Sequence, residues 1–340
     1  MRLGGATAAT TVAGLAGCSS LTNPSGGNGN GNSDSSEVLG YLPQGIAYAG
    51  RGDVTRTLND SAVTQFTNDI LDQFAENEYY SGPTNKQELL TSVSNNAGIE
   101  LSGASTAAGF GKYAGSETAT RGPYYGLYFE ADWSPDEVVN ALESGGLQFT
   151  EGEYSGQTLY EAGREYQPLW LGVAGDDAYV LATEIATKDT LDVSAGNMDS
   201  VGGEMSNAFS AIRDAPFKFV AEMPTNQLPE SGIEVGGSSI DPKRFATVTH
   251  VTGIAYHEDD TAGITLTFLT GGSGDAEDVA NALRGVIAAA AERTQNETVA
   301  NAMNDTSINT DKSTVVVEAS GSVDRATRVI TAIFGLLFGL

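Results

Sequence analysis

The sequence predicts an α+β protein, in which antiparallel sheets carry helices mainly on one face. Three observations lead to this fold class. Strand-like runs come in pairs joined by short turns, as at 169–173 and 178–183 around Gly175-Asp176-Asp177. Segments with helical spacing of apolar residues separate these pairs. A short helix-start pattern also occurs twice. Because hairpins pair antiparallel and helices must bury their apolar side on a sheet, the pattern favours α+β.

Each predicted element has a local signal. A helix over 61–76 follows from apolar positions 62, 63, 66, 70, 71 and 74, with Ser61 as its cap. A helix from Ser134 to Gly145-Gly146 has a Ser cap, Pro at its first position, and two early acids facing the positive end of the dipole. Further helices are predicted at 86–93, 185–194 and 277–292, and strands at 45–50, 105–113, 124–131, 147–150, 157–161, 217–222, 247–257 and 263–270.

The chain contains an approximate repeat. Asp136–Leu142 and Glu277–Leu283 share the order acid, acid, Val, small, Asn, Ala, Leu, and residues 157–162 resemble 313–319. This predicts a duplication, with a first module over 38–200 and a second over 201–340. The alternative is coincidence among acid-capped helices rich in Ala and Val.

Composition limits the function classes. The 340 residues hold 44 Asp and Glu against 17 Lys and Arg, a net charge of −27. Such a field repels phosphates, which argues against nucleic-acid binding. It also destabilises a compact chain unless salt screens it. Few lysines, many acids and 42 glycines are typical of proteins that work in molar salt. An ordinary acidic secreted protein is the alternative.

The N-terminus has the features of an export signal. Residues 3–17 are small and apolar, and Leu15-Ala16-Gly17-Cys18 is similar to a lipobox. With the acidic, low-lysine composition, this resembles exported lipoproteins of haloarchaea, and the resemblance implies cleavage before Cys18 and a lipid on its thiol. The alternative is a chance Cys. Only Arg2 supplies positive charge, so a start several codons upstream is expected, and the route, twin-arginine or general secretory, stays open.

The segment after Cys18 predicts a tether. Residues 18–37 are rich in Ser, Gly and Asn and would span about 25 Å as a flexible linker. We therefore expect a body held by a lipid at the outer face of the cell membrane. Sequons at Asn59, Asn296 and Asn304 are candidate glycosylation sites that fit export.

The sequence contains no recognisable motif for catalysis, for a metal site or for a cofactor. His250 and His257 are seven residues apart, so on one strand they face opposite sides. Asp305, Ser307, Asn309 and Asp311 alternate like calcium ligands, but the pattern lacks the Gly and Glu of a calcium loop, which favours a solvated loop. No nucleophile elbow or phosphate-binding loop occurs. Whether the protein is an enzyme stays open, with the balance against it.

Two apolar features are candidates for binding. Aromatic residues gather between 124 and 170, and Trp133, Trp170 and Tyr128 could stack on a ligand; the alternative is a core role. Val329–Leu340 is uncharged but too short to span a membrane, so it either docks on the sheet or contacts a membrane or partner. The sequence therefore favours a surface binding module for a protein or small molecule. A self-associating envelope component is the alternative, and an extracellular hydrolase is least supported.

Overall fold

A computed structural model describes residues 37–75, 82–113, 122–163, 169–225, 228, 233–235, 238–294, 297–323 and 325. Most of the described strands form one antiparallel sheet of twelve strands, ordered β13-β14-β12-β11-β8-β1-β2-β3-β7-β6-β5-β4. The strands are β1 (Tyr48–Asp53), β2 (Ala104–Gly111), β3 (Tyr125–Ala131), β4 (Phe149–Tyr154), β5 (Gln157–Ala162), β6 (Leu169–Gly175), β7 (Ala178–Thr183), β8 (Phe217–Glu222), β11 (Val248–Glu258), β12 (Thr261–Thr270), β13 (Ser307–Asp311) and β14 (Thr314–Ser322). A small hairpin of β9 (Ile233–Val235) and β10 (Ser238–Ile240) stands apart from it.

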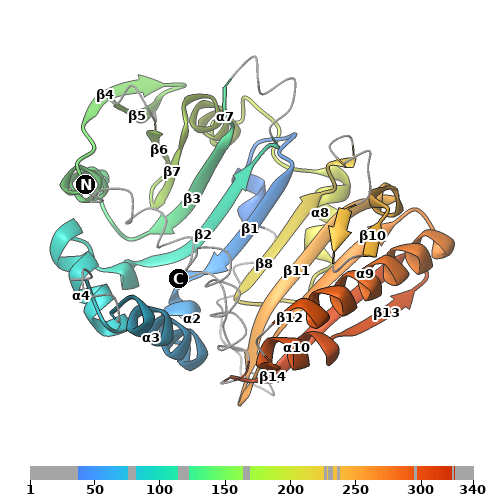
Figure 1. Cartoon of the computed structure of the whole chain (residues 1–340). Helices are drawn as coiled ribbons and strands as arrows, with labels where there is room; N and C mark the ends of the chain where they lie inside the picture. Colours follow the sequence, from blue (N-terminus) through green and yellow to red (C-terminus); the bar gives the residue numbers. More distant parts are fainter. Residues whose placement is uncertain are drawn as a thin grey trace, which may run out of the picture.

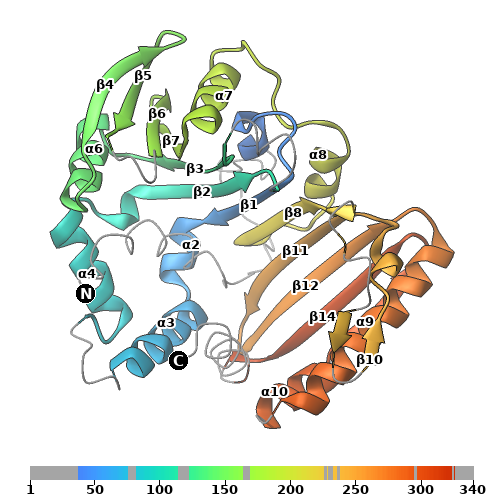
Figure 2. The same cartoon turned by 45° about the horizontal axis from the view of Figure 1, so that its top comes forward.

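Helices connect the strands and cover the sheet (Figures 1 and 2). They are η1 (Glu37–Tyr41), α2 (Val54–Asn59), α3 (Ser61–Ala75), α4 (Lys86–Ala97), η2 (Leu101–Gly103), α6 (Pro135–Ser144), α7 (Glu184–Ser194), α8 (Gly203–Ser210), η4 (Pro242–Phe245), α9 (Ser273–Arg293) and α10 (Glu297–Asn304). The α+β class and the antiparallel sheet are confirmed.

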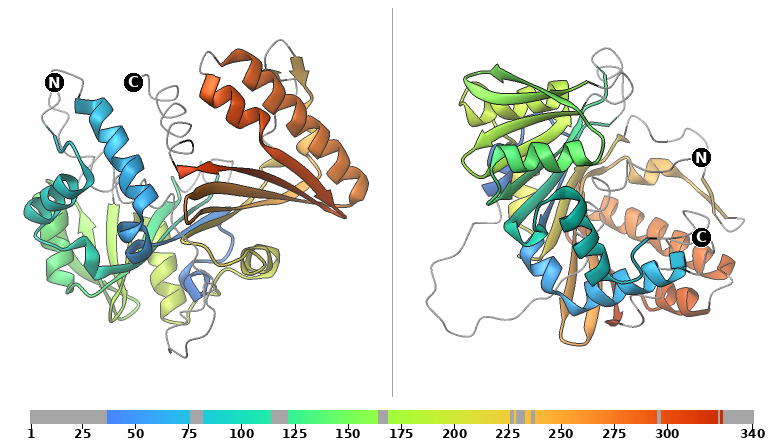
Figure 3. Two further views of the ribbon diagram at one scale, coloured as in Figure 1. Left: turned by 90° about the horizontal axis from the view of Figure 1, so that it is seen from below. Right: turned by 90° about the vertical axis from the view of Figure 1, so that its left-hand side faces the viewer.

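The two faces of the sheet are covered differently. We call the first the α9 face: Phe129 packs with α6, Ala255 with Val63 of α3, and Phe268 with α9. The second, the α7 face, packs residues such as Tyr128 and Val220 against η1, α7 and α8. Figure 3 shows α3, α9 and α10 on one side of the sheet and α7 and α8 on the other. Most of the helices therefore share one face, as predicted, while η1, α7 and α8 cover the other.

Local signals explain the helices that the sequence predicted well. Ser134 and Glu137 form a complete capping box at the start of α6, which satisfies two backbone N–H groups. Helix α3 begins where predicted, but its cap is Asp60 rather than Ser61. The Asp60 carboxylate accepts hydrogen bonds from the N–H groups of Ala62 and Val63 at 2.7 and 3.0 Å.

Other expectations need correction. The predicted solvated loop at Asp305–Asp311 contains the edge strand β13, which pairs with β14 over its whole length. Residues 157–162 and 313–319 also lie in strands that are placed differently: β5 pairs with β4 and β6, whereas β14 pairs with β12 and β13. By contrast, the two helices that share the repeated start pattern both come directly after a strand of the large sheet: α6 follows β3, and α9 follows β12. The duplication stays a prediction, and the two predicted modules share one sheet through β1 and β8.

Candidate functional site

The middle of the α9 face holds a hollow that we call the central groove. Its floor is formed by two neighbouring strands whose residues on this face are very small. Gly50 of β1 lies opposite Gly109 of β2, and Gly52 lies opposite Ala107. Because side chains alternate across a strand, these four residues all face the same side and leave the backbone uncovered.

Large apolar side chains border this floor on both sides. On β8, Phe219 is opposite Gly50 and Phe217 is opposite Gly52. On β3, Leu127 is opposite Gly109. Strands β8 and β3 are three strand spacings apart, which is about 14 Å. Figure 1 shows β8, β1, β2 and β3 side by side in the centre of the sheet. The groove therefore runs along the strands between two rows of apolar side chains.

Tyrosines close one end of the groove. The Tyr48 hydroxyl lies over Gly111, and a Cβ there would also lie 2.8 Å from the Tyr124 carbonyl oxygen, so close packing disfavours a larger residue at this position. Burial, and then the nearby Tyr125, raise the pKa of Tyr48, which keeps this hydroxyl protonated as a hydrogen-bond donor. Tyr125 is 42% exposed, one of the few large apolar side chains of the described chain that are so accessible.

The groove has the size and chemistry of a small-molecule site. Its volume is about 470 Å³, and its described lining residues are Tyr48, Ala49, Gly50, Gly52, Ala107, Gly109, Phe110, Tyr125, Gly126, Leu127, Phe217, Phe219 and Val220. None of them carries a charge. Ligand pockets of 300–1,000 Å³ with mostly apolar linings and a few polar groups are the usual form of such sites. A chain with a net charge of −27 thus presents an uncharged hollow at the centre of its sheet.

Space above the floor is open. A Cβ built on Gly109 would meet no atom within 4 Å, although the backbone there is ordinary extended strand. A Cβ on Gly50 would make only ordinary contacts, the nearest with the Phe219 Cβ at 3.4 Å. The glycine at 109 is thus not required by backbone geometry or by packing against described neighbours. Its effect is to leave the groove empty.

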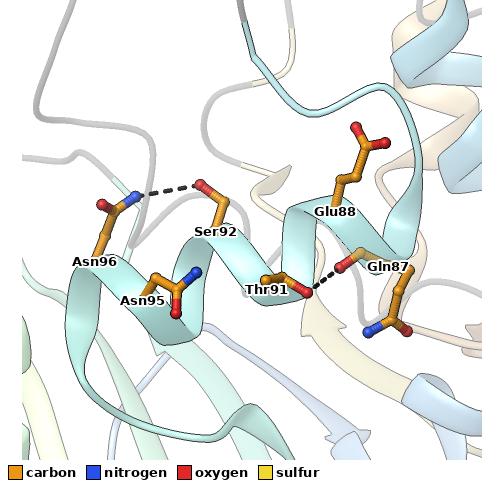
Figure 4. A pocket seen from close by; sticks show the side chains of 6 residues that line it. All are labelled: Gln87, Glu88, Thr91, Ser92, Asn95 and Asn96. Atoms are coloured by element: carbon orange, nitrogen blue, oxygen red, sulfur yellow. Dashed lines mark hydrogen bonds between the residues drawn. The ribbon is translucent and has the colours of Figure 1, made fainter.

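A second hollow, of about 400 Å³, lies against α4 and is polar (Figure 4). The described residues that line it are Gln87, Glu88, Thr91, Ser92, Asn95 and Asn96, all on one helix. Glu88 is already used, since it accepts hydrogen bonds from the N–H and hydroxyl of Thr84 at 2.9 and 3.0 Å. With side chains from a single helix, this hollow lacks the convergent groups of a built site.

A buried polar cluster joins the sheet to the helices beside the groove. The Asp60 Oδ2 lies 3.1 Å from the His257 Nδ1, and both side chains are almost fully buried, at 1% and 6% exposed. The Lys86 ammonium donates to the Leu58 carbonyl and to the Thr64 hydroxyl. Desolvation lowers the pKa of Lys86, while the charge of Asp60 opposes that shift. The cluster ties α2, α3 and α4 to β11, and Val63 of α3 packs with Phe217 of the groove lining.

The aromatic residues predicted to stack on a ligand have other roles. Tyr128 and Trp170 are 0% and 9% exposed and belong to the core on the α7 face. The Tyr128 ring stacks on Tyr41 with centroids 5.1 Å apart. Trp133 packs beside α6, and its Nε1 donates to the Glu100 carbonyl at 3.1 Å. Tyr128 and Trp170 are therefore core residues, whereas Trp133 is only partly buried and its proposed role in ligand stacking stays a prediction.

The remaining predicted residues divide into those described and those outside. Asn59 and Asn304 are exposed at the ends of α2 and α10, although the Asn59 amide donates to the Thr55 carbonyl. Cys18, Asn296 and residues 326–340 lie outside the described residues.

His250 and His257 are buried in β11 on opposite faces, as the odd spacing predicts. Within the described ranges, no group of three His, Cys, Asp or Glu side chains could hold a metal ion. No helix of these ranges is long and apolar enough to cross a membrane.

Sequence reasoning missed the central groove. Its signal is small residues two apart on neighbouring strands: Gly50-x-Gly52 and Ala107-x-Gly109. This spacing identifies a bare floor only when the pairing of the two strands is known.

Comparisons with known proteins give structural similarity alone. No family model matches the chain, and the search of curated proteins finds no match. The chain is similar to the solved structure of crystal form IV of TP0453, with 11% identity over 86% of this chain and 96% of that one, at a TM-score of 0.46. It is also similar to crystal form III of TP0453, with 10% identity over 86% and 97%, at a TM-score of 0.45.

Proposed function

We propose that this chain is an exported, lipid-anchored binding protein of the cell surface, and that it binds an uncharged, mostly apolar ligand in the central groove. The observation that carries the proposal is the groove itself. None of its described lining residues is charged, although the chain has 44 acidic and 17 basic side chains. A hollow kept free of both charges and large side chains favours apolar contact with a ligand.

The lining indicates the class of ligand. Phe217, Phe219 and Leu127 offer apolar contact, and the bare floor of Gly50 and Gly109 lets a flat ring or an acyl chain approach the backbone. The tyrosine hydroxyls at one end supply a polar group for a ligand hydroxyl or carbonyl. An anionic ligand is disfavoured by the net charge of −27. We therefore expect a neutral molecule with one polar end.

The lipid anchor is supported by the sequence. Leu15-Ala16-Gly17-Cys18 precedes a linker rich in Ser, Gly and Asn, and the described body begins after it, at residue 37. Cys18→Ser should release the protein from membranes or leave it as unprocessed precursor. A variant that keeps its lipid label and its membrane fraction would exclude this anchor. Exposure of Asn59 and Asn304 is compatible with their proposed glycosylation.

Filling the groove tests the binding site. The probe is N-phenyl-1-naphthylamine, a neutral apolar fluorophore, titrated into the full chain in molar salt. Gly109→Leu places a side chain where a Cβ meets no atom within 4 Å, so the fold should tolerate it. Displacing ligand contacts worth about 1.5–3 kcal/mol should raise the Kd about ten- to hundred-fold.

The matched control is Gly152→Leu on the exposed edge strand β4, where a Cβ would lie 3.9 Å from the Leu159 carbonyl oxygen. This variant has the same change of residue in a strand of the same sheet, and its Kd should equal that of the unmodified chain. Equal affinity of Gly109→Leu and Gly152→Leu, or no saturable binding by the unmodified chain, would reject the groove as the site.

A further inference from the structure

The apolar side chains of the groove continue into a partly exposed strip, which we call the apolar strip, on the half of the sheet that carries α9. We define the strip as Ile264 and Leu266 of β12 with Phe217 and Phe219 of β8. Phe219 and Leu266 meet over Gly253 of β11, where a Cβ would lie 2.3 Å from Phe219 and 2.9 Å from Leu266. Ile264 is 40% exposed. Phe217, Phe219 and Leu266 are partly buried, so a row of partly exposed apolar side chains runs from the groove across β8, β11 and β12.

The described chain ends beside this strip and has turned onto the same face. Ala319 pairs with Ile264, so Gly321, two residues later, lies on the α9 face. The Arg325 side chain folds back over Gly321, since a Cβ there would lie 3.2 Å from its Cδ. The Arg325 guanidinium also bonds the Asp305 Oδ2 at 2.7 Å, at the end of α10. These contacts fix the direction in which the chain leaves β14.

The residues that follow have matching chemistry and sufficient length. Val329–Leu340 contains no charged residue and includes Phe334, Leu336, Leu337, Phe338 and Leu340. From β14 to β8 is three strand spacings, about 14 Å. Fifteen residues, 326–340, would span about 22 Å even as a helix. The segment can therefore reach the strip and the near side of the groove without unfolding any described element.

We propose that the C-terminal segment, residues 329–340 of the same chain, covers the apolar strip and extends over the groove, where it competes with the ligand. This inference rests on the proposed function in its second half, because competition requires the groove to bind. The occupant is the chain's own segment, since the covalent link delivers it to the strip at a high effective concentration. The contact would remove from water the exposed part of this strip, which includes Ile264 at 40% exposure.

Photocrosslinking on the full chain tests the docking without assuming its register. In a Cys18→Ser background, a benzophenone maleimide is attached to Ile264→Cys, and crosslinked peptides are identified by mass spectrometry. The control is Tyr41→Cys, which is also an exposed large apolar residue, at 37%, but packs on Tyr128 of the opposite face. We expect crosslinks from position 264 to residues 329–340 in monomeric product, and none to that segment from position 41. Crosslinks found only in dimers, or no crosslink to the segment, would overturn the proposal.

A second variant tests the competition. Phe334→Asp with Phe338→Asp leaves the described body unchanged and makes the segment a poor partner for an apolar strip. We expect it to abolish the crosslink from position 264 and to tighten binding of N-phenyl-1-naphthylamine at least five-fold. Unchanged probe affinity, together with a lost crosslink, would overturn the competition. If the unmodified chain binds no probe, the proposed function fails, while the crosslink still decides the docking.

Discussion

Replacing Asp60 with alanine should be among the most destabilising single changes outside the apolar core. Its carboxylate, 1% exposed, accepts N–H groups of Ala62 and Val63 and lies 3.1 Å from the His257 Nδ1. It also faces the charge of Lys86, whose pKa it raises against the effect of burial. One carboxylate thus caps α3, joins α3 to β11, and stabilises a buried ammonium.

The expected magnitude follows from these contacts. Loss of a helix N-cap costs about 0.5–2 kcal/mol. Leaving a buried hydrogen-bonding group without its partner costs about 1–3 kcal/mol, because that group stays desolvated. His257 then has no partner on either ring nitrogen, since its Nε2 is already buried without one within the described residues. Together these costs predict that Asp60→Ala lowers the free energy of unfolding by about 2–5 kcal/mol. Asp60→Asn keeps an acceptor for the cap and should cost less.

Equilibrium unfolding in urea, followed by tryptophan fluorescence at fixed molar salt, measures this difference. The control is Asp214→Ala, which removes a surface ion pair of 3.1 Å with Arg56 from a side chain that is 58% exposed. Such pairs contribute about 1 kcal/mol or less. In a double-mutant cycle, Asp60→Ala and His257→Ala should couple by about 0.5–3 kcal/mol. An Asp60→Ala loss no larger than the control's, or no coupling with His257, would refute the assigned role.

Three more predictions follow. Gly126→Val should destabilise the fold by at least about 1–3 kcal/mol in urea unfolding, because a Cβ there would lie 2.4 Å from the Ala182 Cβ, and a wild-type midpoint would contradict this packing. Burial and then Asp189, which accepts its hydroxyl at 2.8 Å, raise the pKa of Tyr124. The stabilisation that the Tyr124 hydroxyl provides is therefore present below about pH 10 and is lost as the pH rises above that. Tyr124→Phe should lower the free energy of unfolding at pH 7 and reduce its decrease at alkaline pH. The same decrease up to pH 11 in the variant and the unmodified chain would contradict this role of Tyr124. The net charge of −27 predicts that Tm rises from 0.1 to 2 M KCl, as the Debye length falls from about 10 Å to below about 3 Å, and a Tm independent of salt would exclude self-repulsion as a major cost.

The parts of the fold that the sequence predicted are those specified by neighbouring residues. The capping box at Ser134 and the hairpin turn at 175–177 are local, so α6, β6 and β7 appear where expected. The elements that the sequence did not predict depend on partners that are distant in the chain. The polar run of β13 is a strand because β14 offers it a full ladder of backbone hydrogen bonds, and nothing within Ser307–Asp311 reports that ladder.

The candidate site could not be predicted because its signal is the absence of side chains. The binding hypothesis relied on aromatic residues. Large rings such as Tyr128 are also common core residues, and Tyr128 is buried in the core of this protein. A single glycine in a strand usually indicates only a weakly packed position, so no glycine of this sequence identifies a groove by itself. Only the register, with Gly50 opposite Gly109, shows that the glycines of two strands coincide on one face.

The groove, the strip and the acidic surface are connected by the effect of salt. At low ionic strength, a net charge of −27 keeps copies of the chain apart. In molar salt the Debye length falls to about 3 Å, so this repulsion no longer protects an exposed apolar surface. Apolar surface that includes Ile264 at 40% exposure and Tyr125 at 42% then favours self-association unless something covers it. In the arrangement proposed above, residues 329–340 would provide that cover at any protein concentration, because they are tethered to the surface that they cover.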